Sequence, residues 1–209
     1  SLASFNLGSA NTDWQDQIYQ SALTLDNNLS ISGGIKNLPY RVSVGYLSQE
    51  GILKTGKYDR FTGSVNLSPS FFDNYLRINF NVKGSLEKQR VADTRAISSA
   101  ISFDPTQPVY SENSNFNGYF EYDHLASNPA NLNGHFNPLG MLEQADYSKN
   151  TSSSVGNVQI DYKLHFLPDL KANLNTGYDM ARSADSYFMN ENAFEQQIAQ
   201  GLMYDNNPS

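Results

Sequence analysis

The chain has 209 residues, a net charge of −7 at pH 7 and no cysteine. The acidic balance leaves no basic stripe to neutralise phosphates, which argues against a nucleic-acid partner, and the absence of cysteine excludes disulfides and cysteine-based metal sites. No apolar run approaches the roughly 18 residues of a membrane-spanning helix, and the opening SLASFNLGS has no signal-peptide pattern. We therefore expect either a protein that is not exported or an internal piece of a longer one.

Apolar and polar residues alternate with a period of two in six segments. In Tyr75–Gln89 (YLRINFNVKGSLEKQ), Leu76, Ile78 and Phe80 are separated by charged and amide side chains. A strand directs successive side chains to opposite faces, so each segment predicts a strand with one apolar and one polar face. The many tyrosines, phenylalanines and asparagines also favour β structure. The expected strands lie near residues 23–32, 40–47, 60–68, 76–88, 157–166 and 170–181.

The connections between these strands are alternately short and long. GGIKNLP, SPSFFDNY and LPD are short turns rich in Gly, Pro, Asn and Asp. The other connections are SQEGILKTGKYD and the long loop 90–154, and an open tail follows the last strand from residue 182 to 209. Alternate connections of an antiparallel up-and-down meander lie at the same end. One end of the sheet is therefore expected to carry tight turns and the other end long loops.

The long loop 90–154 contains the candidate binding residues. Asp93–Phe103 predicts a short helix with Asp93 as its N-cap, and Leu139–Ala145 predicts one or two further helical turns. Between them lies a stretch rich in aromatic residues and asparagine, in which rings can stack on sugar faces and amides can bind hydroxyls. The alternative is that the rings pack the loop against its neighbours or against a partner protein. The candidate ligand-binding residues are Tyr110, Phe116, Tyr119, Phe120 and Tyr122.

No catalytic constellation is found in the sequence. The chain has no HExxH motif, no GxSxG elbow and no glycine-rich phosphate loop. His124 follows Asp123, His135 stands among Asn and Phe, and His165 lies on the polar face of its strand; an exposed loop pair explains Asp123 and His124 better than a metal or base pair. We expect neither an enzyme nor a metal or cofactor site.

Two architectures fit the alternation: a soluble antiparallel sandwich and the wall of an outer-membrane barrel. The alternation often runs over nine to twelve residues, which suits a tilted membrane-crossing strand of about 9–11 residues better than a typical strand of about 5–6. The asymmetry of short turns and long loops is typical of outer-membrane barrels. Aromatic residues at the ends of the apolar rows suit interfacial girdles, although they also fit sandwich ends; they are Tyr40, Tyr46, Phe71, Phe72, Tyr75, Phe166 and Tyr178.

Six strands do not close a barrel, because the smallest barrels of this kind have about eight. The barrel interpretation therefore makes this chain a segment of a larger wall. The runner-up is an autonomous soluble β-domain that binds carbohydrate or protein through the loop 90–154. In the barrel, the charged residues of the polar rows would line the lumen or contact a plug; they are Arg41, Arg77, Lys83, Asp161, Lys163, Lys171 and Asp179.

Several short sequence motifs resemble those of a known family. In chain order they are NTDW, LSISGG, YLSQEGI, RFTG, DPTQPVY, NPLGMLEQ and IDYKLHFLP. In this series the chain resembles, over nearly its whole length, the early barrel of SusC-like TonB-dependent outer-membrane transporters of the Bacteroidetes.

The resemblance implies an all-β fold, in which residues 1–209 form part of a plugged barrel of about 22 strands. It also implies a place in the outer membrane, in contact with lipid, and a SusD-like surface lipoprotein over the outer loops. The implied cargo is usually a glycan or oligosaccharide and sometimes a peptide. Energy would come from the TonB complex through the plug, of which this sequence contains no motif.

Overall fold

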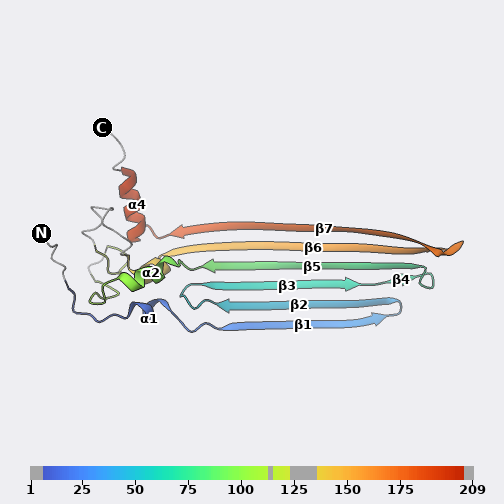
Figure 1. Cartoon of the computed structure of the whole chain (residues 1–209), viewed down its shortest axis with the longest axis horizontal. Coiled ribbons are helices and arrows are strands. Elements are labelled where there is room, and N and C mark those ends of the chain that lie inside the picture. Colours follow the sequence, from blue (N-terminus) through green and yellow to red (C-terminus); the bar gives the residue numbers. More distant parts are fainter. Residues whose placement is uncertain (1–6, 113–114, 123–135, 205–209) are drawn as a thin grey trace.

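The structure, a computed structural model, describes residues 7–112, 115–122 and 136–204. One long sheet extends from a group of helices and loops at one of its ends (Figure 1). The opposite end carries the short turns between strands. No helix in the described residues is both long and apolar enough to span a membrane.

The sheet is an antiparallel meander in which the long strands pair in chain order. The very short β4 lies off this path and pairs with the start of β5. The expected up-and-down topology is confirmed, with β1 and β7 as the two edges. The strands are β1 (Thr24–Ile35), β2 (Leu38–Glu50), β3 (Lys57–Leu67), β4 (Ser70–Phe71), β5 (Leu76–Val91), β6 (Ala145–Leu164) and β7 (Leu167–Met189).

Two strands extend much further toward the loop end than the sequence predicted, while β2, β3 and β5 extend by three residues each. β6 begins at Ala145 instead of residue 157, and β7 continues to Met189 instead of residue 181. Residues 145–154 therefore belong to the sheet and not to the long loop, and residues 182–189 belong to it and not to a tail. The segment ADYSKNTSSS has no apolar alternation to reveal it as a strand. Its position is set by the backbone ladder with β5, which reaches the pair Val91 and Tyr147.

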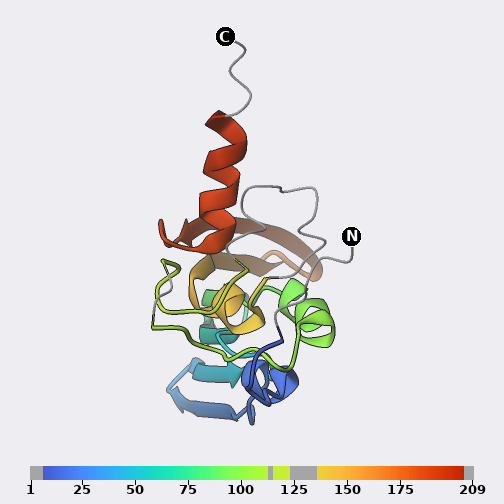
Figure 2. The same cartoon turned by 90° about the vertical axis from the view of Figure 1, so that its left-hand side faces the viewer.

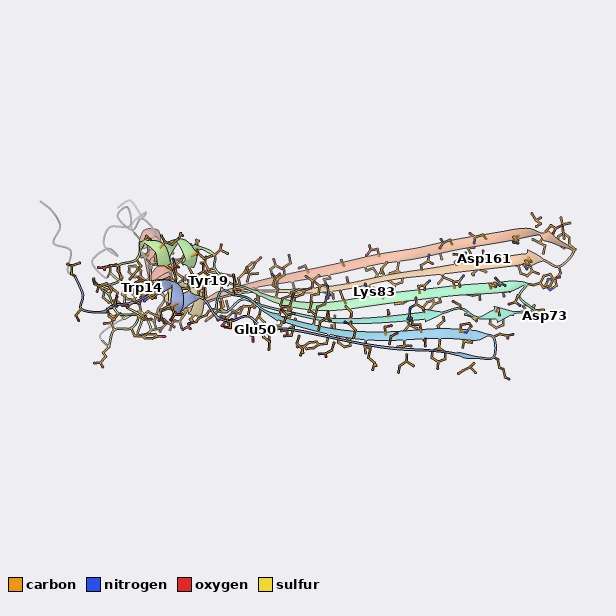
Figure 3. All side chains as sticks on the ribbon, turned by 60° about the horizontal axis from the view of Figure 1, so that its bottom comes forward. Trp14, Tyr19, Glu50, Asp73, Lys83 and Asp161 are labelled. Atoms are coloured by element: carbon orange, nitrogen blue, oxygen red, sulfur yellow. The ribbon has the colours of Figure 1, made fainter. Side chains whose placement is uncertain are left out.

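The register joins the apolar rows of all the long strands into one band on a single face of the sheet. One line of direct partners across the sheet runs Ile31, Val42, Val65, Val82, Gly156 and Tyr178. This face is not sealed, since Ile31, Val42 and Tyr178 are 59%, 40% and 42% exposed. A soluble sandwich would bury this band between two sheets. Figure 3 instead shows side chains projecting freely from the long sheet.

The height of the band matches a membrane. On β5 the apolar row runs from Leu76 to Leu86, which at about 3.3 Å per residue is roughly 33 Å along the strand. A strand tilt of about 45° reduces this to roughly 23 Å, close to the apolar band of about 25 Å on transmembrane barrels. We call this face the lipid face and the opposite, polar face the lumen face.

The compact core of the molecule lies outside the long sheet, in a cap at its loop end. The cap consists of α1 (Trp14–Ile18), α2 (Arg95–Ser102), α3 (Pro138–Glu143) and the segment 103–122 between α2 and α3, seen end-on in Figure 2. A fourth helix, α4 (Phe194–Tyr204), follows β7 and was not expected from the sequence. The buried cluster of the cap consists of Trp14, Ile18, Leu53, Ala96, Ala100, Phe103, Met141 and Leu142.

The two helices expected in the long loop are present, with one difference in capping. The N-cap of α2 is Thr94, not Asp93, and the Thr94 side chain makes no capping bond. The Asp93 carboxylate nevertheless accepts the Arg95 N–H at 2.9 Å, so it satisfies a free donor of the first turn from one position further out. The second helix, α3, begins at Pro138 with Asn137 as its N-cap.

Candidate functional site

The five candidate aromatic residues separate into a buried group and one exposed ring. Phe116 and Tyr119 are 5% and 8% exposed, and Phe120 and Tyr122 pack against the buried cluster of the cap. Tyr110 is 57% exposed. The alternative interpretation, in which the rings pack the loop, therefore describes four of the five residues. A role in ligand binding stays a prediction, and Tyr110 is the residue best placed for it.

Tyr110 is held in place by a small hairpin in the segment 103–122. It forms an isolated antiparallel bridge with Tyr119, and the two ring centroids lie 5.3 Å apart. The turn between them contains Asn117 and Gly118, which have positive φ angles of 54° and 84°. Such angles suit glycine and asparagine. The Ser111 N–H donates to the Gly118 carbonyl at 2.8 Å, which closes the hairpin.

A buried asparagine attaches this hairpin to α3. The Asn137 side-chain N–H groups donate to the carbonyls of Val109 (2.8 Å) and Phe120 (3.1 Å), one on each arm of the hairpin. Its side-chain oxygen accepts the N–H groups of Leu139 and Gly140 at the start of α3, both at 3.1 Å. Asn137 is 0% exposed. One amide therefore fixes the position of both elements that frame the candidate site.

A polar hollow of about 410 Å³ lies between the hairpin and the outer ends of β5, β6 and β7. Its charged groups are already engaged: Tyr119 donates to the Glu143 carboxylate, and Arg90 Nε lies 3.2 Å from Asp146 Oδ2. Burial and the bond to Glu143 raise the pKa of Tyr119, so its hydroxyl remains a donor. The lining residues are Arg90, Asn117, Tyr119, Glu143, Gln144, Ala145, Asp146, Phe188 and Asn190.

This arrangement suits recognition of a polar, uncharged ligand. The exposed Tyr110 ring offers a stacking face beside the hollow, and the amides and carboxylates around it offer donors and acceptors. Sequence reasoning missed Arg90, Glu143 and Asp146, because the loop was expected to continue to residue 154. The available signal was their polarity beside the aromatic loop: Arg90 and Asp146 lie at the outer ends of β5 and β6, and Glu143 ends α3.

The charged residues expected to line a lumen do share one face. Arg77 is the register partner of Asp161, Lys83 of Val155, and Val155 in turn of Asp179. Asn173 donates to Asp161 at 2.6 Å. Lys83 and Asp161 are marked on the sheet in Figure 3. The polar row is thus continuous across the strands, as the apolar row is on the other face.

His165 is the one histidine within the residues that the structure describes, and it packs among aromatic side chains. The His165 ring stacks on Tyr75 at 4.5 Å and its Nδ1 lies 2.8 Å from the Tyr162 hydroxyl, at the turn end of the sheet. His124 and His135, with Asp123, lie outside the described residues. Within residues 7–112, 115–122 and 136–204, no cluster of three His, Cys, Asp or Glu side chains could hold a metal ion.

A meander of long strands with an exposed apolar band, a polar opposite face, tight turns at one end and a cap at the other defines part of the wall of an outer-membrane β-barrel. This chain is 45% identical over 201 residues to the TonB-dependent receptor SusC of Bacteroides thetaiotaomicron, a match that covers 90% of the chain and 20% of that relative. The chain belongs to the family of SusC-like TonB-dependent receptors, proteins of the outer membrane.

Other similarities agree with this assignment. TonB-dependent receptor P26 of Formosa agariphila is 26% identical over 189 residues, which cover 87% of this chain and 18% of that protein. Among solved structures, the RagAB peptide importer in its closed-closed state has a TM-score of 0.66 over 92% of this chain and 22% of the other, with 18% identity. That likeness supports the fold. No family model matches the chain, and the chain spans about a fifth of the length of SusC.

Proposed function

We propose that this chain forms part of the barrel wall of a TonB-dependent importer that brings glycans or oligosaccharides across the outer membrane. The single observation that supports it most strongly is the continuous, exposed apolar band on one face, opposite a continuous polar row. Such a sheet is suited to separate lipid from an aqueous channel. The 45% identity to SusC supports the class of transporter.

The autonomous soluble β-domain is the weaker candidate. It requires the apolar rows to be covered, but Leu29, Leu86 and Leu174 are 61%, 62% and 59% exposed. The edges β1 and β7 each pair on one side in this sheet. In a barrel of about 22 strands both edges would be continued by further strands, which satisfies their backbone groups in lipid.

The proposal extends to partners. A SusD-like lipoprotein would contact the cap, the folded surface at the long-loop end of the wall. The TonB complex would supply energy through a plug inside the barrel, against the lumen face. The wall would then act as part of a conduit and the cap as a contact surface for the lipoprotein, and neither would act as an enzyme. This agrees with relatives that are named receptors and importers.

The cargo can be tested at Tyr110. In the full-length receptor with its partner lipoprotein, Tyr110→Ala should weaken binding of a neutral oligosaccharide by about fivefold, since loss of one aromatic contact is worth about 1 kcal/mol. Phe72→Ala is a matched control, because Phe72 is 66% exposed but lies at the turn end. Calorimetry with oligosaccharides and with peptides of similar size measures the effect. Tight binding of peptides alone would overturn the glycan assignment and favour a peptide cargo.

A further inference from the structure

A second hollow, of about 440 Å³, lies on the lipid face at the outer edge of the apolar band. Its apolar floor contains Phe61 and Leu86, which are 49% and 62% exposed. Ser152 on β6 and Ala184 on β7 have small side chains that lie among the larger side chains of the lining. The floor continues the band that faces the acyl chains, so the hollow opens at the level where acyl chains end and lipid headgroups begin.

Two cations, Lys88 and Arg182, border this hollow. Arg182 is level with Leu86 across the sheet, since Leu86 pairs with Ser152 and Ser152 pairs with Arg182. Lys88 lies two positions beyond Leu86 on the same face. In the part of the chain that the structure describes, neither Lys88 nor Arg182 lies within ion-pair distance of a carboxylate, although Asp59 on β3 is the register partner of Lys88. Long cationic side chains at such a boundary extend toward the headgroups.

The one carboxylate in the hollow on this face is neutralised. Asp59 accepts the Ser48 hydroxyl at 2.6 Å and the Tyr46 hydroxyl at 3.2 Å. Lys57 Nζ lies 3.4 Å from its other oxygen. Glu87 also borders the hollow, but it alternates with Leu86 and Lys88 and so belongs to the lumen face. The local field at the mouth of the hollow is therefore positive in a chain that is acidic as a whole.

We propose that this hollow binds the phosphate-bearing headgroup of an anionic lipid in the outward-facing leaflet, with Lys88 and Arg182 on the phosphate and Phe61 and Leu86 against an acyl chain. The long-loop end of such barrels faces outward, which selects the leaflet. Charge complementarity selects an anionic headgroup over a zwitterionic one. Asn150 and Ser152, on β6 between the two cations, supply further polar groups. The proposal depends on the barrel assignment and is independent of the cargo.

The test uses the full-length receptor in mild detergent and native mass spectrometry. The probes are a phosphorylated lipid A and the same lipid after enzymatic removal of its phosphates. The wild type should retain the phosphorylated lipid about tenfold more strongly. Lys88→Gln with Arg182→Gln should remove that preference, because each cation near a headgroup contributes severalfold. Lys83→Gln with Arg41→Gln, a pair of cations on the lumen face, should leave it unchanged.

Two controls separate other causes. Lys88→Arg with Arg182→Lys keeps both charges and should keep the preference; loss of the preference in this variant would contradict recognition by charge. Millimolar inorganic phosphate should not displace the lipid. Equal retention of both lipids by the wild type, an equal loss in the lumen-face pair, or full displacement by free phosphate would overturn the proposal.

Discussion

On the lipid face, midway along the strands, the phenol ring of Tyr178 on β7 lies over Gly156, its register partner on β6. A Cβ atom at Gly156 would come within 2.2 Å of the ring. The Tyr178 hydroxyl lies 2.9 Å from the Oγ atom of Ser154, which is two residues before Gly156 on β6. The pair Tyr40 and Gly33, between β2 and β1, repeats the arrangement. In both cases an aromatic ring covers a backbone that has no side chain of its own.

The first prediction concerns this contact. Gly156→Ala should lower the free energy of unfolding of the full-length receptor by about 1–3 kcal/mol, because the ring must move away and the bond to Ser154 is lost. Gly63→Ala is the matched control: it also lies on the lipid face, but its Cβ would meet nothing within 4 Å. Urea unfolding in lipid vesicles measures both variants. Equal effects would contradict a role of the ring contact.

The second prediction tests which face meets lipid. Val82→Arg should reduce stability by about 2–4 kcal/mol, the cost of a cation near the bilayer midplane. Asn81→Arg, one residue away on the lumen face, should be close to neutral. Heat-modifiable migration in gels reports how much of each variant reaches the folded barrel. A larger loss for the Asn81 variant would reverse the assignment of the two faces.

The third prediction concerns Asn137 in the cap. Asn137→Ala removes the N-cap of α3 and the side-chain donor to the carbonyls of Val109 and Phe120, of which Val109 keeps the Phe120 N–H as a second donor. Loss of the N-cap lowers the free energy of unfolding by about 1 kcal/mol, and a polar group left unsatisfied lowers it by about 1–3 kcal/mol. The cap should become sensitive to limited proteolysis while the barrel wall stays intact. Asn115→Ala, an exposed asparagine in the same segment, should leave the digestion pattern unchanged.

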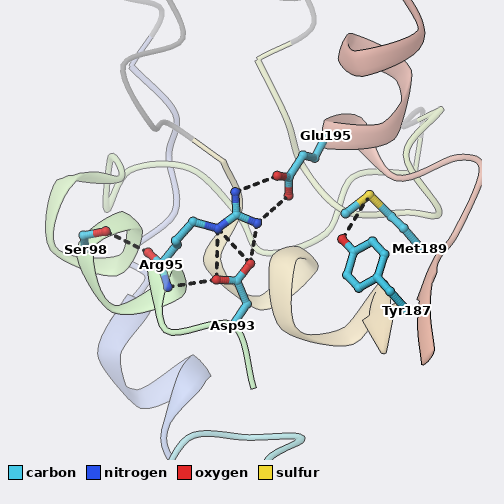
Figure 4. Close-up of polar contacts among 6 residues, drawn as sticks. All are labelled: Asp93, Arg95, Ser98, Tyr187, Met189 and Glu195. Atoms are coloured by element: carbon cyan, nitrogen blue, oxygen red, sulfur yellow. Dashed lines mark hydrogen bonds and ion pairs between the residues drawn. The ribbon is translucent and has the colours of Figure 1, made fainter. Parts of the chain in front are cut away.

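The fourth prediction concerns the link between α2 and α4. Arg95 forms ion pairs with Asp93 at 2.6 Å and with Glu195 at 2.7 Å, as Figure 4 shows. The two carboxylates raise the pKa of Arg95, which remains charged. The group is half-exposed, so Glu195→Gln should cost less than about 1 kcal/mol overall. Hydrogen exchange should nevertheless rise in α4. Glu191→Gln, an exposed neighbour, should leave that exchange unaltered, and a global change instead would contradict a local link.

The fifth prediction is a pH dependence of the cap from Glu121. Its Oε1 accepts the Asn137 N–H at 3.0 Å, while Oε2 is buried without a hydrogen-bond partner among the described residues. Burial raises the pKa of Glu121 to about 8. Because the folded pKa lies above the unfolded value of about 4.3, the folded state binds the extra proton between these values, and stability falls as the pH rises through that window.

The total loss is on the order of 5 kcal/mol between about pH 4 and pH 8. Hydrogen exchange in α3 and the hairpin should accelerate over this range, and Glu121→Gln should flatten the dependence. Glu112→Gln, an exposed glutamate of the same segment, should retain it. A pH dependence that persists in the Glu121 variant would assign it to another group.

Local patterns predicted the wall of this protein well and its cap poorly. The alternation around Leu76, Ile78 and Phe80 was sufficient to assign the two faces of β5. Each residue of such a strand faces either lipid or water, so its polarity alone indicates its face. The outer part of β6 was missed, because its contacts are with residues distant in the sequence, through ladder bonds and side-chain pairs such as Thr151 with Ser183. The burial of Phe116 depends on Phe194, whose ring lies 4.8 Å away across a long stretch of sequence. No local pattern contains that contact.

The buried cluster lies apart from the long sheet, so the cap and the wall are stabilised in different ways: the cap by its surroundings of water, the wall by its surroundings of lipid. The cap coheres by excluding water from Trp14, Leu142 and their neighbours. The wall, by contrast, gains little from water exclusion among its own side chains; its cohesion rests on interstrand hydrogen bonds that a hydrocarbon environment strengthens. A denaturant that attacks aqueous packing should thus unfold the cap at a lower concentration than the sheet. Substitutions in the cap can therefore accumulate without loss of the sheet.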